Sequence, residues 1–180
     1  MTQYVALIRG INVGATRKLP MAELRAALTD AGFEGVKTYI QSGNVVLSSP
    51  KPAAEVCAKL EKLIHDQFKL DVPVAVRTAA EWKKYASGSP FPVMETERPK
   101  LLHLCLTIKP PAADAVEKIE AKALAHERVA IKHGELWIDF GESVGNSKLS
   151  PAVLDKAAGS PLTARNWNTV LAVAALLEDE

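Results

Sequence analysis

The order of strand and helix patterns in this sequence predicts an α+β protein with two ferredoxin-like subdomains, also called alpha-beta plaits. Three observations lead to this prediction. Apolar runs of strand length alternate with amphipathic helical patterns, glycine-containing breaks separate two pairs of runs as in hairpins, and a proline-bearing segment divides the chain. Residues 1–88 read βαββαβ with a short trailing helix. After an irregular linker at residues 89–100, residues 101–180 read βαββ followed by helices.

The first half begins with a continuous apolar run at residues 4–8, a pattern typical of a strand buried on both faces or central in its sheet. Gly43 and Asn44 follow the order that a type II′ hairpin turn favours. Thr78 and Glu81 form a capping box that starts the trailing helix. In the usual plait, strands one and three lie centrally. The strands are predicted at residues 4–8, 36–41, 45–48 and 72–76, and the main helices at 20–31 and 52–68.

The second half repeats this order up to the fourth strand, where a helix is predicted instead. His133 and Gly134 form the turn of its hairpin, and Pro151 begins a short helix. In "TARNWNTV", Thr163 is the expected cap of a longer helix whose apolar face includes Trp167. The strands of this half are predicted at residues 101–108, 128–132 and 135–140.

Lysine and arginine total 22 against 21 aspartate and glutamate residues, so the net charge gives no general attraction to nucleic acid or acidic membranes. The first residues do not fit a signal peptide, and no apolar window reaches membrane-spanning length. We therefore predict a soluble cytoplasmic protein with no membrane partner. Cys57 and Cys105 fit two unpaired thiols in a reducing compartment. Nothing in the sequence indicates the oligomeric state.

The predicted topology brings two polar segments to one edge of the first sheet. In a βαββαβ plait the second strand runs parallel to the first, so the loop "RGINVG" should lie beside the hairpin tip "SGN". An arginine fork, amides, a hydroxyl and glycine backbone near a helix amino end suit an anion. We therefore predict a site for a small anionic or phosphate-bearing ligand. Its residues are Arg9, Gly10, Asn12, Gly14, Ser42, Gly43 and Asn44.

Turn geometry is the alternative explanation of the same residues, because asparagines such as Asn12 and Asn44 commonly bond their own backbone. The carboxyl-terminal motif has the same two interpretations. Lys148, Arg165 and Asn166 are candidates for a second set of ligand donors. The simpler interpretation is a capped helix whose polar side chains bond backbone carbonyls.

No complete catalytic signature is present, so no catalytic residue is predicted and the chain is assigned neither to enzymes nor to non-enzymes. His103 and Cys105 lie two apart on one strand, but no third residue is placed to orient them. The histidines do not have the spacing of metal ligands. We therefore predict neither a metal site nor a cofactor.

Three separated motifs, "YVALIRGINVG", "YIQSGNVV" and "TARNWNTV", resemble the bacterial domain-of-unknown-function family numbered 1697. The resemblance implies two alpha-beta plait subdomains and carries no established activity. Other members often have a second glycine after "INVG", where this chain has Ala15. This difference weakens any claim that position 15 needs the backbone freedom of glycine.

These observations leave three classes of function. The leading hypothesis is a protein that binds a small anionic ligand at the predicted sheet edge. A single-stranded nucleic-acid-binding module is the alternative, because plait sheets can expose aromatic faces, although "YVALI" and "VVL" lack the usual paired aromatics. The third is a structural or protein-interaction role without catalytic activity, in which the polar motifs join the two halves.

Overall fold

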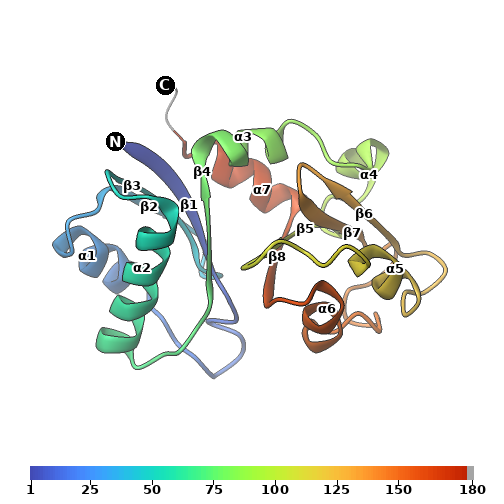
Figure 1. The fold of residues 1–180 in the computed structure, drawn as a ribbon, viewed down its shortest axis with the longest axis horizontal. Coiled ribbons are helices and arrows are strands. Elements are labelled where there is room, and N and C mark those ends of the chain that lie inside the picture. The colour runs from blue at the N-terminus through green and yellow to red at the C-terminus, as the bar shows by residue number, and fades with distance from the viewer. Residues whose placement is uncertain (178–180) are drawn as a thin grey trace. The chain divides into compact units, whose positions relative to one another are not determined.

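The computed structural model describes residues 1–177 and shows an α+β protein with two four-stranded antiparallel sheets (Figure 1). The chain divides into two compact units, and each is described by itself. The first consists of Met1–Lys83 with the segment that begins at Ala172, and the second of Lys84–Leu171. The chain passes from one unit to the other within two helices, α3 (Ala79–Ala86) and α7 (Trp167–Ala174).

In the first unit, the strand order is β2-β3-β1-β4, and two helices cover one face of the sheet. The predicted element order and the central position of the first and third strands are confirmed. Every residue of the apolar run Tyr4–Ile8 is buried, and alternate residues starting with Tyr4 pack with both helices in one core. The elements are β1 (Thr2–Ile8), α1 (Met21–Asp30), β2 (Glu34–Tyr39), β3 (Asn44–Ser49), α2 (Ala53–Phe68) and β4 (Val74–Thr78).

The β2–β3 hairpin has a longer tip than the two-residue turn that the sequence predicts. Asn44 belongs to β3, because it pairs with Tyr39 of β2 on one side and with Leu7 of β1 on the other. The loop therefore comprises residues 40–43, and the backbone turns at Ile40 and Gly43, whose φ angles are 46° and 84°. The type II′ prediction was wrong because a residue with strand partners on both sides cannot be a turn residue.

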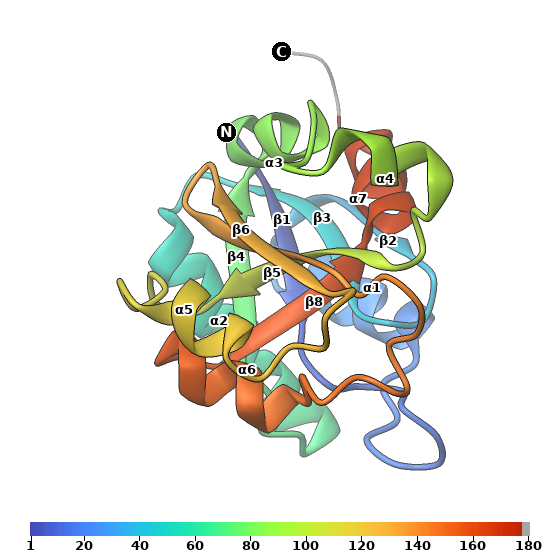
Figure 2. The same ribbon diagram turned by 90° about the vertical axis from the view of Figure 1, so that its right-hand side faces the viewer.

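In the second unit, the strand order is β6-β7-β5-β8, and α5 lies beside α6 on one face of the sheet (Figure 2). Apolar residues of these helices, such as Ile119 and Leu154, share a core with Leu136 and Ile138 of the sheet. The elements are α4 (Pro92–Glu97), β5 (Leu102–Thr107), α5 (Ala115–Glu120), β6 (Arg128–Lys132), β7 (Glu135–Asp139), α6 (Pro151–Ala158) and β8 (Leu162–Asn166).

The fourth strand of the second unit corrects the prediction that a helix stands in its place. Residues 162–166 pair antiparallel with β5, so Thr163 lies inside a strand and caps no helix. Helix α7 begins only at Trp167, and the Oδ1 atom of Asn166 accepts the backbone N–H of Thr169 at 3.0 Å. Pairing with β8 satisfies backbone groups that β5 would otherwise leave open along one edge.

The segment predicted as an irregular linker, residues 89–100, contains α4. Pro92 occupies the first turn of this helix, where backbone N–H groups have no acceptor within the helix, so the missing N–H of proline costs no hydrogen bond. The prolines therefore do not prevent regular structure here, and that part of the prediction was wrong. That residues 89–100 link two domains able to fold independently stays a prediction. Among residues 1–177, no helix is long and apolar enough to cross a membrane.

Candidate functional site

Asn12 joins the loop after β1 to the tip of the β2–β3 hairpin. Its Nδ2 donates to the backbone carbonyls of Leu19 at 2.9 Å and Gln41 at 2.7 Å. Its Oδ1 accepts the backbone N–H of Leu19 at 2.8 Å. The structure thus brings "RGINVG" and "SGN" together at one sheet edge, as the topology predicts. The amide of Asn12 is already used to hold them there.

Gly43 allows the hairpin tip to lie directly against the end of β1. The backbone N–H of Ile8 donates to the Gly43 carbonyl at 2.8 Å. A β carbon at Gly43 would lie 2.9 Å from side-chain atoms of both Ile8 and Ile11, which is too close for real contacts. Gly43 is therefore placed by packing, and its backbone is not open to a ligand.

Asn44 is also engaged within the fold. Its side chain is buried, and its Nδ2 donates to the Tyr39 carbonyl at 3.0 Å and to Ser42 Oγ at 2.8 Å. Both bonds hold the loop that connects β2 to β3. For Asn12 and Asn44, the geometry matches the turn interpretation of the sequence.

The basic residues lie on the solvent-facing part of the loop that follows β1. We call residues 9–18 the basic loop. Gly10, Gly14, Arg17 and Lys18 are exposed, and Arg9 is half-buried. Arg17 Nη1 lies 3.4 Å from the position that a β carbon of Gly10 would take, so its guanidinium rests beside exposed glycine backbone. Within residues 1–177, the side chains of Arg17 and Lys18 have neither a hydrogen-bond partner nor an ion-pair partner.

The three candidates of the second unit, Lys148, Arg165 and Asn166, differ in their burial and in what their side chains bond. Arg165 is buried, and its Nη1 donates to Thr163 Oγ1 and to the Ala164 carbonyl, each at 2.8 Å. Burial lowers the pKa of its guanidinium to about 10. Asn166 caps α7, whereas Lys148 is exposed in the loop between β7 and α6. Arg165 and Asn166 are neighbours on a strand, so their side chains point to opposite faces.

Neither thiol has the properties of a nucleophile. Burial raises the pKa of Cys105 to about 12, and burial with nearby Glu61 raises the pKa of Cys57 to about 11. Burial also lowers the pKa of His103, whose ring packs edge-on against Phe140 at 5.0 Å between centroids. A thiol needs a lowered pKa to react at neutral pH. In the part of the chain described, residues 1–177, no group of three or more His, Cys, Asp or Glu side chains could hold a metal ion.

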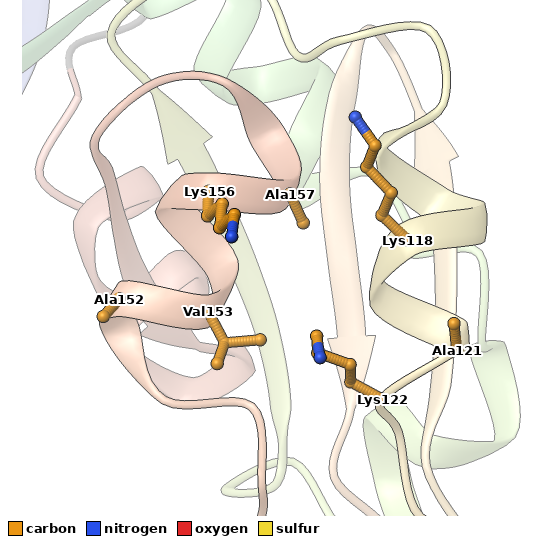
Figure 3. A pocket seen from close by; sticks show the side chains of 7 residues that line it. All are labelled: Lys118, Ala121, Lys122, Ala152, Val153, Lys156 and Ala157. Atoms are coloured by element: carbon orange, nitrogen blue, oxygen red, sulfur yellow. The ribbon is translucent and has the colours of Figure 1, made fainter.

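A groove between α5 and α6 was not predicted from the sequence (Figure 3). Its volume is about 600 Å³. Four of its lining residues have short apolar side chains, and three are lysines. Lys118 belongs to α5, Lys156 to α6, and Lys122 to the turn that follows α5. A signal was present, because Lys118 and Lys122 lie four residues apart, a spacing that favours one face if the helical pattern continues. The lining residues are Lys118, Ala121, Lys122, Ala152, Val153, Lys156 and Ala157.

Comparison with known proteins finds a similar solved structure and a matching family profile. The conserved bacterial protein SP0830 from Streptococcus pneumoniae has a solved structure that resembles this chain with a TM-score of 0.73 and 23% sequence identity, over 98% of this chain and 99% of that one. At this identity the likeness shows the fold alone. No curated protein matches the chain. A family profile matches residues 1–137, and the chain therefore belongs to the family described as Protein of unknown function (DUF1697).

Proposed function

We propose that this chain is a cytoplasmic bacterial protein that binds a small anionic or phosphate-bearing ligand at the basic loop. The observation that carries the proposal is the exposed pair Arg17 and Lys18, which has no charge partner among residues 1–177 on a loop held in place by Asn12. We also propose that both units are ferredoxin-like plaits. The order βαββαβ and the corresponding strand orders of the two sheets support this.

The chemistry of the basic loop suits an anion better than a neutral ligand. A guanidinium offers planar paired donors for phosphate or carboxylate oxygens, and an ammonium adds a second positive charge. The exposed glycines Gly10 and Gly14 permit close approach of a ligand to the backbone. Fixing the loop before binding reduces the entropy that a ligand must offset.

A thermal-shift titration with inorganic phosphate and with nucleoside phosphates tests this site. The double variant Arg17→Ala/Lys18→Ala should lose the rise in melting temperature that the unmodified protein shows. The matched control is Arg25→Ala/Lys62→Ala, which removes the same charge from exposed helix positions of the same unit and should respond normally. Equal responses from the two double variants would reject the basic loop as the site.

A structural role is the second candidate, because the amides of Asn12 and Asn44 and the guanidinium of Arg165 bond groups of the chain itself. If this role is the whole function, Asn12→Ala lowers stability and no phosphate compound raises the melting temperature of any form. If the basic loop binds a ligand, the folded Asn12→Ala protein shows a weakened response, since its loop is no longer held. The nucleic-acid alternative stays a prediction.

A further inference from the structure

The groove between α5 and α6 combines an apolar lining with lysine side chains. Its apolar lining consists of the short side chains of Ala121, Ala152, Val153 and Ala157. Figure 3 shows Val153 reaching into the gap from α6 and Lys122 reaching toward it from the other side. A volume of about 600 Å³ lies within the range of sites for small organic ligands.

The charge around this groove is positive and only partly compensated. Lys118 forms an ion pair with Asp114, with 2.8 Å between Nζ and Oδ2. The side chains of Lys122 and Lys156 form no hydrogen bond or ion pair with any residue in the range 1–177. Because these two lysines come from the two sides of the groove, a negative group placed between them would be attracted by both.

We propose that this groove binds a small anionic amphiphile. Its apolar body lies on the alanines and Val153, and its carboxylate or phosphate group lies between Lys122 and Lys156. A fully hydrated inorganic anion would gain nothing from the apolar lining, whereas an uncharged apolar compound would gain nothing from the lysines. The two features together select a ligand that carries both parts. This site is separate from the basic loop and does not depend on it.

The test uses the full chain with isotope-labelled methyl groups and two probes, decanoate and decyl phosphate, below the concentrations at which they form micelles. At least one of them should shift the Val153 methyl resonances in a saturable titration at low ionic strength. Decyltrimethylammonium has the same chain length and the opposite charge, and it should bind more weakly. Lys122→Gln/Lys156→Gln should weaken binding of the anionic probe by about tenfold, which corresponds to the loss of about one strong charge interaction.

Lys100→Gln/Lys109→Gln is the matched control, because it removes two exposed lysines of the same unit that do not line the groove. Its affinity for the anionic probe should equal that of the unmodified protein. The proposal is overturned if the cationic and anionic amphiphiles bind equally, if the shifted resonances lie outside the groove, or if neither anionic probe binds.

Discussion

At the scale of single residues, the packing of the β2–β3 hairpin tip requires glycine at position 43, where there is no space for a side chain. Gly43 has a φ angle of +84°, and its missing β carbon would clash with Ile8 and Ile11. A left-handed conformation costs a non-glycine residue about 1–2 kcal/mol, and forced packing adds roughly 1–3 kcal/mol. Gly43→Ala should therefore lower the free energy of unfolding by about 2–5 kcal/mol in urea titrations.

Gly32 provides the control for this prediction. Its φ angle of +87° is nearly the same, but nothing lies within 4 Å of the place where its β carbon would stand. Gly32→Ala should therefore show only the conformational cost of about 1–2 kcal/mol. If both substitutions cost the same, the contacts with Ile8 and Ile11 do not constrain the hairpin tip.

Topology could be used to predict which residues lie near one another, but not what their side chains bond. The nearness of Asn12 to the hairpin follows from the order of strands, because the loop and the tip share one sheet edge. The three bonds that occupy the Asn12 amide depend on positions within a few tenths of an ångström. No residue pattern specifies those positions, so the sequence favoured the turn role of Asn12 only slightly over a binding role.

At the scale of elements, the segment 162–166 shows where local pattern is insufficient. "LTARN" is short and is followed directly by an amphipathic helical pattern. Its residues were therefore assigned to the helix and not to a strand. Its conformation is set by pairing with β5, which is distant in sequence. Tertiary pairing of this kind overrides local propensity. The first sheet was easier to predict because its strands are separated by clear turn residues.

The start of α7 carries the element-scale prediction. Asn166 supplies the cap, and Asn166→Ala should destabilise the protein by about 1 kcal/mol in chemical unfolding, because the Thr169 N–H loses its acceptor. Asn168→Ala is the control, since Asn168 is exposed within the same helix and alanine is a better helix former. Finding that Asn168→Ala is the more damaging change would refute the assignment of Asn166 as the cap.

At the scale of the whole molecule, both units use the same order of elements and the same order of strands. The duplication is visible in architecture although the sequence shows no residue-level repeat. The chain enters and leaves the second unit within α3 and α7, where no proline or glycine cluster marks a boundary. Composition therefore indicated that two halves exist, but the helices that connect them could be located only in three dimensions.

The pH dependence of stability is the prediction for the folded chain as a whole. Burial lowers the pKa of His103 below its ordinary value of 6.5, the Leu101 carbonyl opposes this shift, and the charge of Arg165 adds to it. Between the lowered pKa of the folded chain and about pH 6.5, the unfolded chain therefore binds a proton at this position that the folded chain does not. The contribution of His103 to the free energy of unfolding is at its full value above pH 6.5. It falls as the pH drops toward the lowered pKa, by up to about 1.4 kcal/mol per pH unit.

Urea unfolding followed by circular dichroism at pH 7.5 and at pH 5.5 measures this effect. His103→Gln removes the titrating group and keeps a polar side chain, so its loss of stability between the two pH values should be smaller than that of the unmodified protein. Asp66 and Asp114, whose pKa values are lowered by Lys62 and Lys118, titrate below their ordinary value of 3.8 and do not contribute in this window. Parallel losses in the two proteins would show that His103 is not the group whose protonation weakens the fold.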